Sequence, residues 1–186
     1  AHLDHIGGLT TADGSFVFKN AKYFIAKKEF DFWIKATRND FRKSALYNKP
    51  DVLATITKNI QKVLKILEPK ITFYDHSKTL YSNFNFIEAP GHTPGMTLLH
   101  ATSGDETMLF VADLIHSDIL LFPHPEWGFY GDADLDKAVA SRKKILQMLT
   151  EKRFKAQGYH LPFPGTGHVK KAANNYSWLP EAYFEG

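Results

Sequence analysis

Apolar residues recur with helical spacing in three stretches of the chain. In residues 27–37 and 52–67 they return at i, i+3 and i+4, which predicts two helices that each have one apolar face. A third helix is predicted to start at Asp132 or Asp134 and to run through Leu149. The apolar stripe of this third helix consists of Ala138, Ile145, Leu146 and Leu149.

Short apolar runs with turn residues between them predict β-strands in the rest of the chain. The expected strands cover residues 21–26, 71–74, 79–81, 84–89, 96–101, 107–112 and 156–159. The segment 162–167 is expected to be a loop, and the aromatic tail 176–180 is expected to dock on the body of the protein. This order favours helices packed on a mixed or antiparallel sheet, within a single α+β domain over residues 1–186.

Composition narrows the class of protein. The chain has 186 residues, of which 44% are hydrophobic and 23% charged, as in an ordinary globular domain. No apolar run approaches 18 residues, and the net charge of +3 is small and dispersed, so neither a membrane nor a nucleic-acid partner is expected. Cysteine is absent, which leaves only nitrogen and oxygen ligands for any metal. The compartment stays open between cytoplasm and periplasm.

The first residues of the chain carry a cluster of metal-ligand side chains. His2, Asp4 and His5 precede the glycine pair Gly7-Gly8, which lets the backbone turn tightly. Imidazole and carboxylate groups bind zinc-like ions. Such clusters also occur by chance on protein surfaces. Support for a metal site therefore depends on further ligand-type residues later in the chain.

Three further ligand-type residues stand beside turns or strand ends. His92 lies within Pro90–Gly95, Asp113 follows a predicted strand, and His160 follows the Gly158-Tyr159 pair. If these strand ends meet on one rim, the six groups can surround two ions. Two ions about 3.5 to 4 Å apart share a bridging water and lower its pKa toward neutrality. Among the six, Asp113 and Asp4 have the two oxygens needed to bridge both ions.

These motifs resemble those of the metallo-β-lactamase superfamily, and within it the methyl-parathion-hydrolase and lactonase-like branch. The resemblance covers residues 1 to about 170. The segments that carry it are His2-Leu3-Asp4-His5, Gly91-His92-Thr93-Pro94-Gly95, Ala112-Asp113, His124-Pro125-Glu126-Trp127 and Gly158-Tyr159-His160-Leu161-Pro162-Phe163-Pro164-Gly165.

The resemblance implies an αββα sandwich with a two-metal site at the sheet edge. It would place His2 and His92 on one ion, Asp4, His5 and His160 on the other, and Asp113 between them. The family motif His-x-His-x-Asp-His would put its first histidine immediately before Ala1. We therefore expect the chain to be the C-terminal portion of a longer protein, without the N-terminal part of the sandwich.

The expected activity is that of a dinuclear metallo-hydrolase. A metal-bridging hydroxide would attack a lactone, ester or phosphotriester, with zinc as the first choice of metal and iron or manganese as alternatives. Asp4 and Asp113 are the expected catalytic carboxylates, Asp4 as a proton donor to the leaving group. Trp33 is expected to line the substrate pocket. The expected partner is a small-molecule substrate, with a homodimer left open.

Two alternatives remain at this stage. A non-hydrolytic, iron-binding redox or sulfur-handling protein of the same fold would use the same ligand types. An inactive fragment is the other, because a first site without its leading histidine would hold metal weakly. Of the other histidines, His76, His100 and His116 are expected to bond locally or face solvent, with a place behind the ligands as the alternative for His116. His124 is expected to belong to a rigid loop between prolines, and His168 to a surface loop, with a substrate contact as its alternative.

Overall fold

The computed structural model describes residues 1–173 and 175–182. Its α-helices are α1 (Leu3–Ile6), α2 (Lys27–Lys35), α3 (Pro50–Leu67), α4 (Asp118–Leu121) and α5 (Leu135–Lys152). Its strands are β1 (Tyr23–Ala26), β2 (Ile71–Tyr74), β3 (Phe84–Glu88), β4 (Thr97–Ser103), β5 (Glu106–Phe110), β6 (Lys155–Gln157), β7 (Thr166–Ala172) and β8 (Asn175–Pro180). Short 3-10 turns are η1 (Gly7–Leu9), η2 (Arg38–Phe41), η3 (Ala45–Asn48), η4 (Glu68–Lys70) and η5 (Ala112–Leu114).

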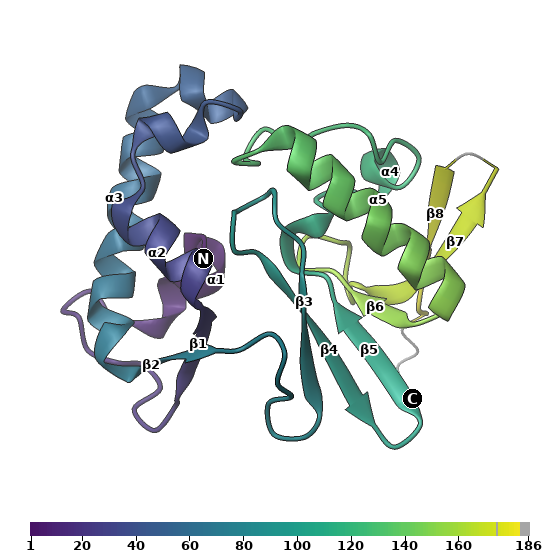
Figure 1. The fold of residues 1–186 in the computed structure, drawn as a ribbon, viewed down its shortest axis with the longest axis horizontal. Helices are drawn as coiled ribbons and strands as arrows, with labels where there is room; N and C mark the ends of the chain where they lie inside the picture. Colours follow the sequence, from purple (N-terminus) through teal and green to yellow (C-terminus); the bar gives the residue numbers. More distant parts are fainter. Residues whose placement is uncertain (174, 183–186) are drawn as a thin grey trace.

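The strands form two sheets. β1 and β2 pair in parallel, and β3 to β8 form a six-stranded sheet in chain order. The six-stranded sheet is mixed, because β5 and β6 run parallel whereas every other neighbouring pair is antiparallel. Figure 1 shows β1 and β2 with α2 and α3 on one side of the molecule, and the larger sheet with α5 on the other.

Each side of the molecule has its own apolar core. The larger sheet and α5 bury one cluster, in which Leu98, Leu109 and Leu146 have no exposed surface. The helices α2 and α3 bury a second cluster around Trp33 and Ile60, which are also fully buried. Burial of a large apolar side chain contributes about 1.5 to 3 kcal/mol, so each cluster can hold its own layer together.

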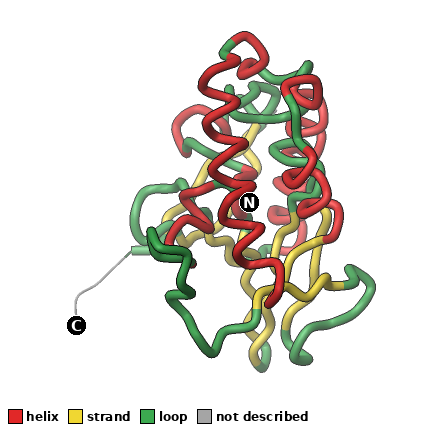
Figure 2. The backbone as a smooth tube through the Cα atoms, turned by 90° about the vertical axis from the view of Figure 1, so that its left-hand side faces the viewer, coloured by secondary structure: helices red, strands yellow, loops and turns green. Residues whose placement is uncertain are grey.

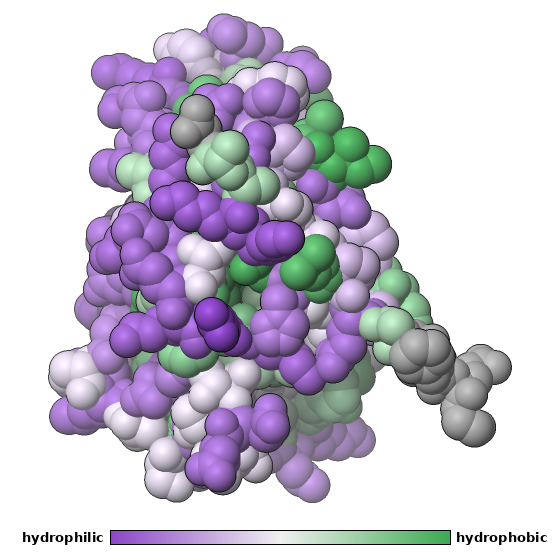
Figure 3. Space-filling model, turned by 90° about the vertical axis from the view of Figure 1, so that its right-hand side faces the viewer, coloured by the Kyte–Doolittle hydropathy of each residue, from purple (hydrophilic) through white to green (hydrophobic). Residues whose placement is uncertain are grey.

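The helical layer contains the two helices predicted from the spacing of apolar residues. Figure 2 shows α3 running the height of this side of the molecule. Its buried side chains include Leu53, Ile60, Leu64 and Leu67, as the stripe predicts. Among the described residues, no helix has the length and apolar character needed to cross a bilayer. Figure 3 shows the opposite face, where hydrophilic side chains predominate and apolar groups lie in small separate clusters.

Two local predictions are wrong. Residues 79–81 form no strand and contribute only an isolated bridge between Leu80 and Phe84, because the backbone turns through positive φ at Tyr81 and Ser82. The segment 162–167 is not all loop, since β7 begins at Thr166, and the tail docks as strand β8 paired to β7. Asp134 is confirmed as the N-cap of α5, where its carboxylate accepts a hydrogen bond from the Lys137 N–H.

Candidate metal centre

The six ligand-type residues predicted from the sequence lie together where the two layers meet. His2 stands at the start of α1, and Asp4 and His5 lie within this helix. His92 comes from the loop between β3 and β4, Asp113 from η5 after β5, and His160 from the loop after β6. The ligand atoms of His2, His92 and Asp113 all lie within 4.8 Å of one another, and so do those of Asp4, His5 and His160.

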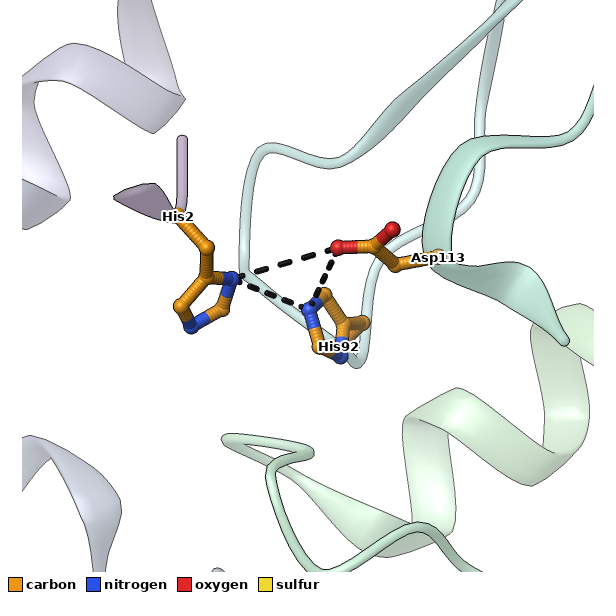
Figure 4. A group of neighbouring side chains, drawn as sticks. All are labelled: His2, His92 and Asp113. Atoms are coloured by element: carbon orange, nitrogen blue, oxygen red, sulfur yellow. Dashed lines mark hydrogen bonds and ion pairs between the residues drawn. The ribbon is translucent and has the colours of Figure 1, made fainter. Parts of the chain in front are cut away.

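Asp113 lies at the centre of this arrangement. The Nε2 atom of His5 lies 2.8 Å from Asp113 Oδ1, and Nε2 of His160 lies 3.2 Å from the same oxygen. The other oxygen, Oδ2, lies 3.0 Å from Nε2 of His92 and 4.0 Å from Nδ1 of His2. Figure 4 shows His2 approaching from α1 while His92 and Asp113 approach from the other side. One carboxylate thus touches both groups of ligands.

The second group is more open to solvent than the first. Oδ2 of Asp4 lies 3.6 Å from Nε2 of His5 and 3.5 Å from Nε2 of His160, and the Asp4 side chain is 46% exposed. By contrast, His92 and Asp113 are buried. Tyr159 supports the open group, because its ring packs 4.1 Å from that of His5 and its hydroxyl donates to the Asp4 carbonyl.

The ionisation of the cluster follows from burial and crowding. Burial and the neighbouring His92 lower the pKa of His2 to about 3. Burial alone would raise the pKa of Asp113, but hydrogen bonds from His5 and His92 outweigh it and hold that pKa well below its usual range. Burial opposes protonation of His92, yet bonds to Asp113 and Asp132 raise its pKa. Asp113 is therefore an anion among nitrogen donors.

Comparison with known proteins gives a solved structure that covers the whole chain. AidC, a dizinc quorum-quenching lactonase solved with the product N-hexanoyl-L-homoserine, is 52% identical with a TM-score of 0.97. The alignment covers 100% of this chain and 63% of AidC. The chain belongs to the metallo-β-lactamase superfamily.

Two further solved structures have the same metallo-β-lactamase fold. The hydrolase AbOPH of the β-lactamase superfamily is 26% identical with a TM-score of 0.87, over 99% of this chain and 62% of that one. A probable metal-dependent hydrolase from Staphylococcus aureus is 14% identical with a TM-score of 0.72, over 99% and 61%. This chain thus spans less than two thirds of the length of each of the three. Neither a protein-family model nor a curated protein matches it.

The residues present fit the pair of ions expected of a metallo-β-lactamase. Oδ1 of Asp113 is buried and has no hydrogen bond of acceptable geometry to any described residue, although two imidazole nitrogens lie within 3.2 Å of it. A buried oxygen without a bond is costly, and a cation between it and the nitrogens would remove that cost. Nitrogen and carboxylate donors in groups of three also match zinc chemistry, and a third group joins His116 to Asp113 and His160.

Trp33 is buried directly beside the candidate metal centre. Its side chain has no exposed surface, and the edge of its ring packs against that of His2, with 5.0 Å between centroids. Its indole N–H donates to the buried carboxylate of Glu29, which also accepts from the Gly95 N–H. In this structure Trp33 supports His2 and the His92 loop, and its expected contact with substrate stays a prediction.

Several groups around the centre were not identified from the sequence. Asp132 was considered only as a helix cap, but it is fully buried and bonds to Nδ1 of His92. Arg142 lies within the apolar stripe of α5, between Ala138 and Ile145. A charge on the buried face of a predicted helix was the signal that could have revealed it. Nothing in the sequence pointed to Tyr159, apart from its position next to His160.

The remaining histidines follow the expectation only in part, since among the described residues His100 and His116 each have a buried ring nitrogen without a hydrogen-bond partner. His116 lies beside the centre, with its ring 5.0 Å from that of His92 and 4.7 Å from that of His160. His76 bonds Thr97, whereas His124 stacks on Trp127 away from the ligands.

A cavity opens directly onto the ligands. Its volume is about 330 Å³, and one end is lined by ligand groups that include Asp4, Asp113 and His160. The other walls are mostly apolar and consist of Leu3, Leu46, Ile56, Phe129 and Tyr130. A small molecule with one polar, reactive end and an apolar body would fit this distribution.

Proposed function

We propose that the protein is a two-metal hydrolase that opens the ring of lactones, with N-acyl homoserine lactones as the substrate class. The observation that carries the proposal is the convergence of His5, His92 and His160 on Asp113 from three separate segments. The 52% identity to the dizinc lactonase AidC over the whole chain supports both the metal and the substrate class.

Two groups of residues would hold the ions. His2 and His92 would bind one, Asp4, His5 and His160 the other, and Asp113 would bind both through its two oxygens. Bound divalent ions supply a water nucleophile at neutral pH and polarise the substrate carbonyl. Asp113 suits the shared position because its low pKa keeps both oxygens anionic.

The chain itself orients the substrate and handles the proton. The apolar walls of the cavity, such as Leu46 and Ile56, would take the acyl chain and leave the lactone carbonyl at the ligand end. Asp4 lies at the open side of the centre, where its half-exposed carboxylate can accept the proton that the attacking water loses and pass it to the ring oxygen as the C–O bond breaks. Phe129 and Tyr130 limit the access of bulk water to the reacting bond.

The test measures metal content and turnover in one set of proteins. Zinc-loaded protein should open N-hexanoyl homoserine lactone, with one proton released per ring opened, and Asp113→Ala should lose both bound zinc and turnover. Asp105→Ala, in the exposed turn between β4 and β5, is the control and should keep both. An aryl phosphotriester assayed in parallel shows whether the site also accepts phosphoryl centres. Full turnover with normal metal content in Asp113→Ala would refute the mechanism.

A further inference from the structure

A buried carboxylate lies directly behind His92. Asp132 has no exposed surface, and its Oδ1 lies 3.0 Å from Nδ1 of His92. Its second oxygen accepts a hydrogen bond from the Phe129 N–H. The backbone beside it adds two more bonds, since the Ala133 N–H donates to the His92 carbonyl and the Asp134 N–H donates to that of Gly91. Residues 132–134 therefore hold the His92 loop in place with both side-chain and main-chain hydrogen bonds.

A buried guanidinium connects Asp132 to the rest of the centre. Arg142 of α5 is 1% exposed, and its Nη2 lies 3.7 Å from Oδ2 of Asp132. Its Nε donates to the carbonyl of Leu114, the residue that follows Asp113. Its Nη1 donates to the carbonyls of Pro125 and Trp127. One side chain thus contacts the supports of two ligands, His92 and Asp113, from outside the centre.

An ion pair between Asp132 and Arg142 is energetically costly at this buried position. Removal of two charges from water costs several kcal/mol for each ion, and apolar residues of similar volume often stabilise a fold equally well. Arg142 lies on the same face of α5 as Ala138 and Ile145, where an apolar residue would be expected. Stability alone therefore gives little reason for an ion pair here, whereas orientation of the ligands gives a specific one.

The hydrogen bond to Asp132 determines which nitrogen of His92 faces the centre. When Nδ1–H donates to Asp132, Nε2 is the nitrogen that faces the centre, 3.0 Å from Asp113 Oδ2 and 3.0 Å from Nδ1 of His2. In the neutral ring, the lone pair of Nε2 is then the one available to a metal. A carboxylate behind a ligating histidine fixes both its tautomer and its ring orientation. The bond from Arg142 to the Leu114 carbonyl restrains the turn that aims Asp113 at the same point.

We propose that Asp132 and Arg142 are a positioning pair for the metal centre, which holds His92 in its ligating tautomer and fixes the turn that carries Asp113. The inference rests on the proposed function only in requiring that the centre binds metal. Neither residue reaches the cavity, so neither is a catalytic residue.

The main test compares two aspartates that stand two positions apart. Asp132→Asn should weaken zinc binding about 10- to 100-fold in a chelator competition titration. The control Asp134→Ala removes the side-chain N-cap of α5 and so costs about 0.5–2 kcal/mol of stability, but it touches no ligand side chain and should keep wild-type zinc affinity. A loss of affinity that merely followed stability would appear equally in both variants.

A second variant and a spectroscopic measurement keep the test decisive if Asp132→Asn does not fold. Arg142→Lys retains the charge but cannot reproduce the fork of donors to Leu114, Pro125 and Asp132, so it should also weaken zinc binding. Long-range ¹H–¹⁵N spectra of the chelator-treated protein, taken at alkaline pH because bonds to Asp113 and Asp132 raise the pKa of His92, should show His92 as the Nδ1–H tautomer in the wild type. This preference should be reduced in whichever of the two variants folds.

The outcomes separate the inference from the proposed function. If the wild type binds zinc and both variants bind it as tightly, with the tautomer of His92 unchanged, the positioning role is wrong and the hydrolase proposal stands. A wild-type protein that binds no zinc overturns both.

Discussion

At the scale of single residues, His116 is the clearest case of a side chain whose charge is set by its surroundings. Its ring stacks on Phe129 at 3.6 Å and lies next to His160, and its buried Nδ1 has no hydrogen-bond partner in the part of the chain that the structure describes. Burial lowers the pKa of His116 to about 3, and the charge of His92 adds to the effect. His116 is therefore neutral throughout the physiological range.

This burial predicts how stability depends on pH after metals have been removed with a chelator. Between pH 6 and 5 an unfolded histidine takes up a proton, since its pKa is about 6.5, but folded His116 does not. The unfolded state binds more protons, so the free energy of unfolding falls as the pH falls, by up to about 1.4 kcal/mol per pH unit for each such histidine. His2, with a pKa of about 3, adds a second contribution of the same sign.

His116→Phe keeps an aromatic ring on Phe129 but cannot be protonated. It should therefore reduce the slope of unfolding free energy against pH by about half in this window, as measured by urea denaturation at several pH values. His92, whose pKa is raised, contributes in the opposite direction and mainly above this window. An unchanged slope in His116→Phe would show that His116 is already charged in the folded protein.

The sequence was informative about residues whose type alone implies chemistry. His2, Asp4, His5, His92, Asp113 and His160 could be selected because each stands in or beside a turn. Asp132 and Arg142 could not be assigned, since their role depends on a contact between segments far apart in the chain. The role of Trp33 could not be decided for the same reason, because sequence cannot tell a ring that lines a cavity from one packed beneath a ligand.

At the scale of elements, the loop that carries His92 is clamped between two helices. A Cβ atom on Gly91 would lie 2.1 Å from the backbone nitrogen of Ala138 in α5. A Cβ atom on Gly95 would lie 2.3 Å from the backbone nitrogen of Glu29 in α2. Both distances are far below van der Waals contact, so only glycine allows the loop to approach both helices. Close packing on both sides of the loop therefore fixes the orientation of the His92 ring.

Gly95→Ala should therefore disturb stability and metal binding together. The added methyl group must push α2 away from the loop, which should cost about 1–3 kcal/mol or more by the usual penalty for overpacking. Zinc affinity should fall as well, because His92 moves with the loop. Thermal unfolding and chelator competition measure the two effects. Gly8→Ala is the matched control and should change neither, since nothing lies within 4 Å of the added atom.

The elements that the sequence predicted well are those with a long periodic pattern. The helices α3 and α5 have 18 residues each, and their apolar stripes face the cores. Short strands were less predictable, because whether they form depends on pairing with strands that can be distant in the sequence. β7 and β8 stabilise each other from Gly167↔Pro180 to Ala172↔Asn175, although neither has a strong local signal.

At the scale of the whole molecule, the candidate metal centre is the place where two separately cored layers meet. α1 packs against α3 of the helical layer, and it brings His2, Asp4 and His5. The sheet layer brings His92, Asp113 and His160. Because the two apolar clusters are separate, bound ions would join the layers as well as prepare the centre for chemistry.

Metal should therefore stabilise the folded protein in a way that depends on its concentration. A ligand that binds only the folded state adds about 2.7 kcal/mol when its free concentration is 100 times its Kd. We expect the Tm to rise with zinc and to fall with EDTA. Asp113→Asn should remove the zinc-dependent shift and Asp105→Asn should keep it. Equal Tm values in zinc and EDTA for the wild type would contradict a centre that links the layers.

Loss of metal should first release α1. This helix has four residues, too few to be stable alone, and no residue within it is buried. Hydrogen exchange with EDTA should therefore rise sharply at α1, while α3 and α5 stay protected by their own cores. Uniform loss of protection across α1, α3 and α5 would instead mean that the ions stabilise the entire fold rather than the junction between its layers.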